Sequence, residues 1–235
     1  MHRYYCRTPI EGDAATLDDA EAHHLLHVLR ARPGMEVVLF DGGGAEFAAS
    51  VVACRRAEVE LTILARNEVD RELPFPLTLG VALPKGDRQR WLVEKATELG
   101  VTRLVPLATE RTVGGDKRGG EKLDRYVVEA SKQCGRNRLM EIAEPLAWDA
   151  WLGVAEPVAR RWFAHPGGRS IGGDEIVTPC VAYAAVGPEG GFTDDEAAAA
   201  IAAGWQTIGL GTCILRVETA AVAIAALHAQ SAGTR

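Results

Sequence analysis

The C-terminal part of the chain repeats one local pattern, and this repetition constrains the fold more than any other feature. A short apolar run over residues 181–186 leads into the glycine-bearing stretch 187–193. A second run over 207–210 leads to Gly211, and a helical pattern follows each stretch. Short continuous apolar runs are typical of strands that are buried on both faces. The sequence therefore predicts an α/β fold with a mostly parallel sheet and ligand-binding loops at the carboxyl ends of its strands.

The first of these loops and the helix start after it contain residues of two kinds, those that cap the helix and one that is a candidate for catalysis. Gly190 and Gly191 permit positive φ angles or the close approach of backbone to a ligand. Thr193 is placed to cap the following helix, and Glu196 three residues later completes a capping box. Carboxylates at this position also complement the helix dipole, so we expect them to cap. Glu189 lies within the loop itself and is the carboxylate to consider for catalysis.

The second loop and its helix indicate a small-molecule site without a common nucleotide motif. Apolar residues recur at helical spacing over 217–227 and predict a buried stripe that includes Leu227. Neither loop contains the GxxxxGK[ST] pattern of a phosphate-binding loop or the GxGxxG pattern of a dinucleotide site.

Composition limits the class of protein. A chain of 235 residues fits one large or two small domains. The five cysteines are scattered without a CxxC pair, which argues against a disulfide framework and against a zinc site. The N-terminus lacks the apolar segment of a signal peptide, and no apolar run approaches membrane-spanning length. We therefore expect a soluble, cytoplasmic protein without a bound metal.

The first 70 residues read mainly as short strands and predict a small β-barrel. We expect strands at 37–40, 46–54 and 58–64 and a helix at 17–29. His23, His24 and His27 lie close together on this helix, but no further ligand completes a metal site, so packing or RNA contact is the favoured interpretation. A polar, proline-bearing connector at 68–76 divides the chain into domains 1–70 and 71–235.

Charge is unevenly distributed along the chain. The formal net charge of −6 is a mild argument against a nucleic-acid partner. Residues 111–138 nevertheless carry eight basic side chains against four acidic ones. Such a segment is either a solvated helix face or an RNA contact. The glycine-rich stretch 114–120 within it predicts mobility.

Long motifs give the chain a family resemblance. GPEGGFT and LGTCILRVETA resemble the paired cofactor loops of the SPOUT methyltransferases. More narrowly, the chain is similar to the bacterial 16S ribosomal RNA uridine-N3 methyltransferase family, ribosomal RNA small subunit methyltransferase E. Further matches are HVLR at 27–30, EASKQCGRNR at 129–138 and the pattern around Lys85, Lys95 and 98–101. The family usually continues the 129–138 motif with Val-Pro, where this chain has Leu139 and Met140.

The resemblance implies a fold, a cofactor and partners. The fold is a C-terminal SPOUT domain with a deep trefoil knot, preceded by a PUA-like RNA-binding β-barrel. S-adenosylmethionine is the implied cofactor, 16S ribosomal RNA or the small ribosomal subunit the partner, and a homodimer forms through the knotted domain. A loop at 165–168, after a strand at 161–164, is the first of three cofactor loops. The implied cofactor-binding residues are His165, Val186, Gly187, Glu189, Gly190, Gly191, Leu210, Gly211, Ile214, Leu215, Arg216 and Thr219.

The resemblance also implies residues for RNA binding and catalysis. The expected RNA contacts are Arg30, Lys85, Arg111, Lys132, Arg136 and Arg138. For Arg136 and Arg138 the sequence leaves another role open, as charges that complement a helix C-terminus. Glu189 is a candidate general base for the uridine N3 proton. Arg216 is the alternative catalytic candidate, as a cation that stabilises negative charge on the uracil oxygens.

Two other functions compete with uridine-N3 methylation. The first is another SPOUT RNA methyltransferase that acts on the ribose 2′-oxygen or on another base. The second is a non-catalytic RNA-binding factor in ribosome assembly. The intact GPEGG and ILRVETA loops argue against the second, because they speak against a loss of cofactor binding.

Overall fold

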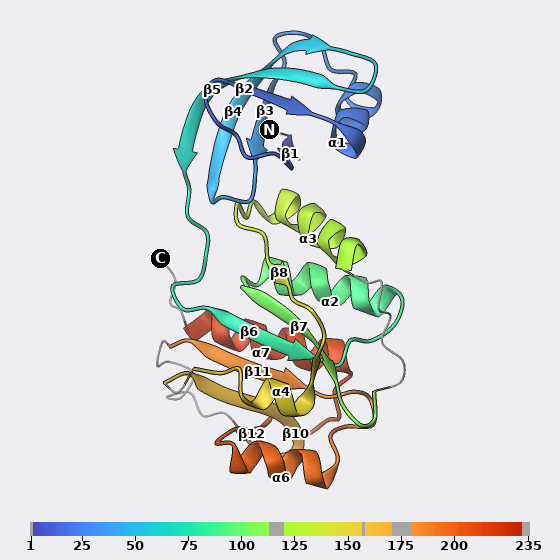
Figure 1. Cartoon of the computed structure of the whole chain (residues 1–235), viewed down its shortest axis with the longest axis vertical. Coiled ribbons are helices and arrows are strands. Elements are labelled where there is room, and N and C mark those ends of the chain that lie inside the picture. Colours follow the sequence, from blue (N-terminus) through green and yellow to red (C-terminus); the bar gives the residue numbers. More distant parts are fainter. Residues whose placement is uncertain (1, 113–119, 157, 171–179, 232–235) are drawn as a thin grey trace. The chain divides into compact units, whose positions relative to one another are not determined.

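A computed structural model describes residues 2–112, 120–156, 158–170 and 180–231 (Figure 1). The stretch 114–119, for which the sequence predicts mobility, lies outside the described residues. The chain divides into two compact units. One comprises Met1–Glu72 with Val128–Leu139, and the other Leu73–Val127 with Met140–Arg235. None of the helices in the described ranges is long and apolar enough to cross a membrane.

The first unit is built on a five-stranded sheet with the order β1-β3-β4-β5-β2. The pair β1–β3 is parallel, and the other pairs are antiparallel. Apolar side chains alternate along β4, and their inward face packs on Leu25 and Leu39 in the core. The three predicted strands are confirmed. The strands are β1 (Arg3–Tyr5), β2 (Ala14–Leu17), β3 (Glu36–Phe40), β4 (Ala45–Cys54) and β5 (Val59–Glu68).

The helix predicted at 17–29 is shorter and less regular than its sequence pattern indicates. Leu17 belongs to β2, because it pairs with Val59 in the sheet and is buried there. The helical segment consists of α1 (Asp19–His23) and the π-helix η1 (His24–Val28). Asp19 and Arg30, at its two ends, have φ angles of 45° and 54°. Only a few per cent of non-glycine residues adopt this left-handed region, so both ends of the segment are strained.

The second unit contains a parallel sheet, whose order along the main path is β12-β10-β11-β6-β7-β8, with β9 paired to β7. All five residues of β6 are buried, as expected of an inner strand of a parallel sheet. The bounds are β6 (Leu77–Val81), β7 (Arg103–Ala108), β8 (Glu141–Ile142), β9 (Leu146–Ala147), β10 (Arg160–Ser170), β11 (Ala182–Val186) and β12 (Gln206–Gly209).

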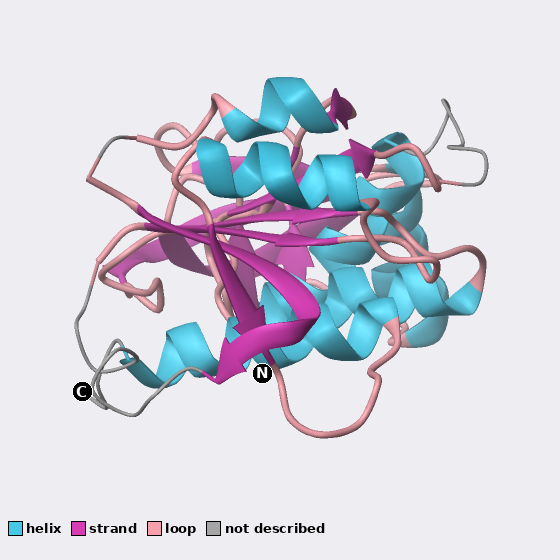
Figure 2. Cartoon of the chain, turned by 90° about the horizontal axis from the view of Figure 1, so that it is seen from below, coloured by secondary structure: helices cyan, strands magenta, loops and turns pink. Residues whose placement is uncertain are grey.

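Helices lie on both faces of this sheet (Figure 2). On one face α2 (Asp87–Glu98) packs against α7 (Val217–Ser231), and α7 contacts β6 and β11. On the other face α4 (Trp148–Leu152) contacts β7 and α6 (Asp194–Ala202). The remaining helix, α3 (Gly120–Cys134), begins in this unit, and its last turns belong to the first unit.

Aromatic side chains form the core beneath α4 and α6. The ring of Trp148 lies 4.3 Å from that of Phe192 between centroids, and Trp151 lies 5.5 Å from Trp205. Phe163 of β10 contacts both Trp148 and Phe192 edge-on. Phe192 follows the first glycine-bearing loop, so this core anchors the loop to the sheet.

The strand predicted at 161–164 continues well beyond Ala164. Ile208 of β12 is opposite both Ala164 and Arg169, so residues 165–168 bulge out of a strand that ends at Ser170. The sequence predicted a loop after the strand, and the structure corrects this to a bulge within it. The cause is the non-local pairing of Arg169 and Ser170 with β12, which no local pattern reveals.

Candidate functional site

The first loop is a tight turn at the carboxyl end of β11. The amide of Gly191 donates to the carbonyl of Pro188 at 2.8 Å, and Gly191 has a φ of 70°. A side chain at Gly187 would lie 3.1 Å from the ring of Phe192, so the backbone rests directly on that ring. The loop therefore uses Gly187 for close packing and Gly191 for a left-handed turn.

The predicted capping box at the start of α6 is confirmed. The amide of Glu196 donates to Thr193 Oγ1 at 3.2 Å, and the amide of Thr193 donates to Glu196 Oε2 at 2.9 Å. The other carboxylate oxygen, Oε1, accepts from the amide of Glu110 at 2.8 Å. One side chain thus caps α6 and fixes the segment after β7 to the first loop.

Arg111 makes a second contact between the same two segments. Its Nη1 donates to the carbonyl oxygen of Gly190 at 2.7 Å and to that of Phe192 at 3.4 Å. The sequence predicts Arg111 as an RNA contact. Its guanidinium holds the first loop in place, so a role in supporting that loop accompanies any contact with RNA.

The bulge 165–168 and the end of β12 approach each other more closely than side chains would allow. A Cβ atom at Gly168 would lie 2.4 Å from the carbonyl carbon of Ile208, and one at Gly209 would lie 2.5 Å from the carbonyl oxygen of Gly168. Within the bulge, Nδ1 of His165 accepts from the amide of Gly167 at 3.2 Å. His165 therefore shapes the bulge, and two glycines permit its contact with the strand that leads into the second loop.

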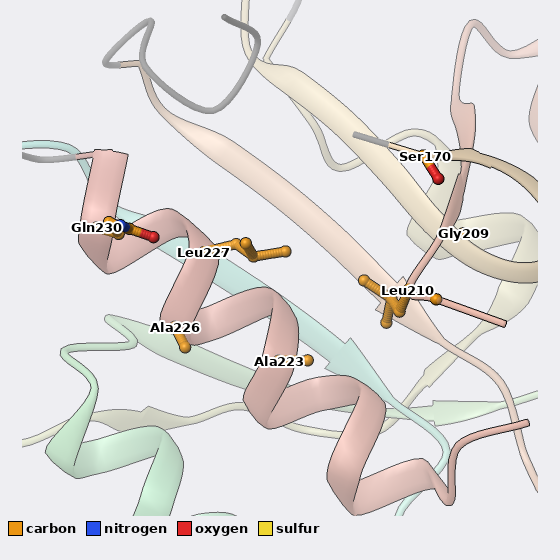
Figure 3. Close-up of a pocket in the computed structure, with 8 residues that line it drawn as sticks. Ser170, Gly209, Leu210, Ala223, Ala226, Leu227 and Gln230 are labelled. Carbon is orange, nitrogen blue, oxygen red and sulfur yellow. The ribbon is translucent and has the colours of Figure 1, made fainter. Parts of the chain in front are cut away.

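A cavity of about 460 Å³ lies between the ends of β10 and β12 on one side and α7 on the other (Figure 3). Its wall on α7 is apolar except at Gln230, and the side chain of Leu227 points toward that of Leu210 across the cavity. Leu227 belongs to the stripe predicted to be buried; in the structure it is half-buried and lines the cavity. The lining residues are Ser170, Gly209, Leu210, Gly211, Ala223, Ala226, Leu227 and Gln230.

The structure brings only some of the predicted cofactor residues to this cavity. Leu210 and Gly211 line it, whereas the residues of the first loop do not. Ile214 is 90% exposed, Arg216 and Thr219 are exposed, and Leu215 is half-buried. An apolar side chain as exposed as Ile214 on a predicted ligand loop is available to pack against a ligand.

An ion-pair cluster joins the first loop to two helices. Nη1 of Arg88 on α2 lies 3.1 Å from Oε1 of Glu189 and 3.9 Å from Oε2 of Glu218 on α7. Sequence reasoning assigned a role to neither Arg88 nor Glu218. Glu218 lies within the LRVETA motif, and this position is the sequence feature that could have pointed to a role for it.

Two of the predicted RNA contacts are buried in the first unit. Arg136 is 3% exposed, and its guanidinium is hydrogen-bonded to both carboxylate oxygens of Glu72. Lys132 is mostly buried and bonds Glu21 at 2.8 Å. The structure thus argues against phosphate contacts for both, since their charged groups are committed to internal carboxylates.

Burial and ion pairing shift the pKa of Lys132 in opposite directions. Burial disfavours its charge, but hydrogen bonding to Glu21 and the charges of Glu21 and Glu129 outweigh it and raise the pKa of Lys132. The neighbouring Tyr4 has its pKa raised to about 12, first by burial and then by the charge of Glu21. Both side chains therefore keep their protons at neutral pH.

The other candidate RNA contacts are exposed. The backbone of Arg138 pairs with Gly42 and Gly43. A Cβ atom at Gly44 would lie 3.0 Å from the guanidinium of Arg138, so this side chain passes close to the Gly44 backbone. Arg30 lies in the strained backbone after η1. Lys85, in the second unit, is also exposed. In the described parts of the chain, no group of three or more metal-binding side chains is arranged to hold a metal ion.

Comparison with known families gives matches over both units. A family model described as an RNA methyltransferase domain matches residues 71–229, and one described as an RNA methyltransferase PUA domain matches residues 17–64. The second match confirms the PUA-like domain that the sequence predicts.

Individual proteins match over nearly the whole chain. Ribosomal RNA small subunit methyltransferase E of Synechocystis sp. is 37% identical over 91% of this chain and 72% of its own. The crystal structure of the enzyme of that name from Neisseria gonorrhoeae, bound to S-adenosylmethionine, superposes with a TM-score of 0.87 at 31% identity, covering 96% of this chain and 95% of that one. A methyltransferase of Legionella pneumophila in complex with the same cofactor gives a TM-score of 0.87 at 32% identity, covering 97% of each chain.

Proposed function

The chain belongs to the ribosomal RNA small subunit methyltransferase E family, and we propose that it transfers a methyl group from S-adenosylmethionine to N3 of a uridine in 16S ribosomal RNA. The observation that carries the proposal is the convergence of the end of β10, the second loop and α7 around one cavity. In this proposal domain 1–70 binds RNA and domain 71–235 carries the transfer site.

The cavity has the size and chemistry that the cofactor needs. Its volume of about 460 Å³ lies in the range of small-molecule sites. Leu210, Ala223 and Leu227 offer apolar surface to a flat base, and the backbone of 209–211 offers hydrogen-bonding groups. We assign the adenosine part of the cofactor to this cavity. The first loop and the exposed Ile214 then border the rest of the molecule.

Methyl transfer from this cofactor requires little covalent participation of the protein. When bound, S-adenosylmethionine supplies a methyl group that its sulfonium already activates. The loops orient the two reactants, which contributes on the order of several kcal/mol to catalysis. Glu189 is exposed on the first loop and accepts the N3 proton, while Arg216 is exposed on the second and stabilises charge on the uracil oxygens.

These two roles give a direct kinetic prediction. Glu189→Gln and Arg216→Ala should each lower the single-turnover rate at saturating cofactor, by about 10²–10⁴-fold for the loss of a general base. Cofactor affinity, measured separately by calorimetry, identifies any share of the loss that arises from binding. Near-normal rates in both variants would remove both residues from the mechanism.

The RNA contacts in this proposal are the exposed cations. Arg30 and Arg138 serve in the first unit and Lys85 and Arg111 in the second, while Lys132 and Arg136 act inside the first unit. We further propose a homodimer through a knotted C-terminal domain in the cytoplasm, where small subunits are assembled. Light scattering of the purified protein tests the dimer.

One reaction tests the proposed function and separates it from its alternatives. Small ribosomal subunits without the modification are incubated with the protein and labelled cofactor, and the labelled nucleoside is identified by mass spectrometry. We expect 3-methyluridine from 16S ribosomal RNA. A 2′-O-methylated nucleoside or another methylated base would indicate another RNA methyltransferase, and cofactor binding without transfer would contradict catalysis on this substrate.

A pair of variants tests the cavity assignment. Ala226→Phe places a ring in the cavity from an exposed position of α7 and should abolish cofactor binding without unfolding the protein. Ala198→Phe makes the same change at an exposed position of α6 that does not line the cavity. Calorimetry should show full affinity in the control. Equal affinity in the two variants would place the cofactor elsewhere.

A further inference from the structure

Three charged residues from three elements meet beside the first loop. Arg88 comes from the first turn of α2, Glu189 from the loop after β11, and Glu218 from the first turn of α7. Their side chains differ sharply in exposure, at 41% for Arg88, 58% for Glu189 and 8% for Glu218. One cation therefore faces an exposed carboxylate on a loop and a buried one on a helix.

The two ion pairs are unequal. The contact from Arg88 Nη1 to Glu189 Oε1 is 3.1 Å, which is a hydrogen-bonding distance, whereas the same nitrogen lies 3.9 Å from Glu218 Oε2. Oε2 of Glu218 is buried and has no hydrogen-bond partner among the residues that the structure describes. Buried carboxylate oxygens without a hydrogen bond are uncommon because their desolvation is not compensated.

Arg88 is thus at hydrogen-bonding distance from the better-solvated carboxylate, Glu189, and not from the buried carboxylate, Glu218. Glu189 is more than half exposed, and water can replace Arg88 as its partner at little cost. Glu218 has no such access to water. A movement of Arg88 Nη1 by less than an ångström toward Oε2 would complete the missing hydrogen bond.

We propose that Arg88 is a positioning residue of the methyl-donor site that exchanges partners when the ligand binds. Arg88 holds Glu189 in the free protein and moves to Glu218 when Glu189 engages a donor group of the ligand. The exchange keeps the cation paired throughout, so Glu189 is released for the ligand at a low cost. This inference rests on the proposed function, because it takes the first loop as part of the cofactor site.

The chemistry of Glu189 defines the ligand group. A carboxylate accepts hydrogen bonds from N–H or O–H groups and attracts positive charge. S-Adenosylmethionine carries an ammonium group, two ribose hydroxyls and a sulfonium charge, all of which suit one oxygen of this carboxylate, and the other oxygen remains for the N3 proton of the uridine. Glu218 thereby acts on the ligand through Arg88 and not by contact.

The test measures the coupling between positions 88 and 218 in cofactor binding. Glu218→Gln removes the charge that receives Arg88, so the cation stays on Glu189 and the dissociation constant should rise about three- to tenfold, as for one partly buried charge pair. In the Arg88→Met background the same substitution should leave the dissociation constant unchanged. Calorimetry of the four proteins completes a double-mutant cycle.

Two controls separate positioning from folding. Arg90→Met removes a neighbouring cation of α2 that pairs with Glu94 and does not contact the cluster, and it should leave cofactor affinity unchanged. Melting temperatures of all variants reveal a purely structural effect. If Glu218→Gln folds poorly, Glu218→Asp keeps the charge but draws the carboxylate away from Arg88, and it should weaken binding in the same direction.

The outcomes are distinct. Wild-type affinity in Glu218→Gln, or an equal loss with and without Arg88, would overturn the exchange of partners. Absence of cofactor binding to the wild-type protein would contradict the proposed function itself. Weakened binding that depends on Arg88, with little change in melting temperature, would support the positioning role.

Discussion

At Gly168 the backbone leaves no room for a side chain, and this gives a sharp prediction. Gly168→Ala would place a Cβ atom 2.4 Å from the carbonyl carbon of Ile208, so the bulge must move away from β12. We expect a loss of about 1–3 kcal/mol in the free energy of unfolding, together with weakened cofactor binding. Denaturant titration and calorimetry measure the two effects.

Gly167 provides the matched control for this substitution. A Cβ atom there would lie 3.6 Å from Nδ1 of His165, which is ordinary van der Waals contact. Gly167→Ala should therefore leave both stability and affinity near the wild-type values. Equal effects at the two positions would show that the close approach of Gly168 to β12 has no special importance.

Arg136 and Arg138 are two residues apart and should respond oppositely to replacement. Arg136→Ala leaves Glu72 without its bidentate partner and should lower the free energy of unfolding by about 3 kcal/mol. Arg138→Ala removes an exposed cation and should weaken RNA binding and its salt dependence, with little change in stability. Filter binding at several salt concentrations, with denaturant titration, distinguishes the two. An unstable Arg138→Ala protein would contradict the assignment.

The sequence showed that the segment 111–138 is basic but not which of its charges face water. Lys132 and Arg136 pair with Glu21 and Glu72, which lie far away along the chain. Such distant partners are visible neither in the local charge pattern nor in the family resemblance that suggested both residues as RNA contacts. The same limit applies to Arg88 and Glu218, whose proximity arises only when α2 and α7 pack.

At the scale of single elements, the capping residue Glu196 of α6 also contacts the segment after β7 and so supports the first loop. Thr193→Ala removes one capping hydrogen bond and should cost about 1 kcal/mol. Glu196→Ala removes the other half of the box and also the contact to the Glu110 amide. We therefore expect a larger loss of stability and a weaker affinity for the cofactor from Glu196→Ala than from Thr193→Ala. Similar affinities would show that the Glu110 contact does not support the first loop.

Elements defined by local chemistry were predictable, and those defined by distant pairing were not. The capping box of α6 and the strand β11 follow from short-range signals and are confirmed. The extension of β10 depends on β12, and the loss of Leu17 from the helix to β2 depends on its pairing with Val59. The π-helical turn at His24–Val28 also carried no recognisable local signal.

At the scale of the whole molecule, the two units carry different spectroscopic reporters. All five tryptophans of the chain lie in the second unit, at positions 91, 148, 151, 162 and 205. Four of them are buried, so their emission changes when that unit unfolds. Tryptophan fluorescence therefore follows the second unit, and far-ultraviolet circular dichroism follows both.

The units also differ in the groups that make stability depend on pH. In the second unit, burial lowers the pKa of His228; a hydrogen bond to the Phe75 carbonyl opposes this shift and the charge of Arg160 adds to it. In the first unit, burial of Glu46 opposes its ionisation, but hydrogen bonds from Arg3 and Arg71 outweigh burial and lower the pKa of Glu46. Each group is thus less protonated in the folded state than in the unfolded chain.

The two shifts place the losses of stability in different pH ranges. His228 contributes fully above about pH 6.5, its ordinary pKa, and its contribution declines as the pH falls below that value. The contribution of Glu46 is intact until the pH falls below about 4.5. One proton changes the free energy of unfolding by at most about 1.4 kcal/mol per pH unit. Acidification should therefore weaken the second unit first.

Denaturant titrations between pH 7.5 and 4.0 test this order. The tryptophan-detected midpoint should begin to fall below pH 6.5, while the part of the circular dichroism change that belongs to the first unit should hold until about pH 4.5. His228→Gln keeps a donor for the Phe75 carbonyl without a titratable ring, so it should flatten the tryptophan-detected curve between pH 6.5 and 5. A variant curve as steep as the wild-type one would assign the loss to other groups. Coincident midpoints for both probes at every pH would instead mean that the two units unfold as one.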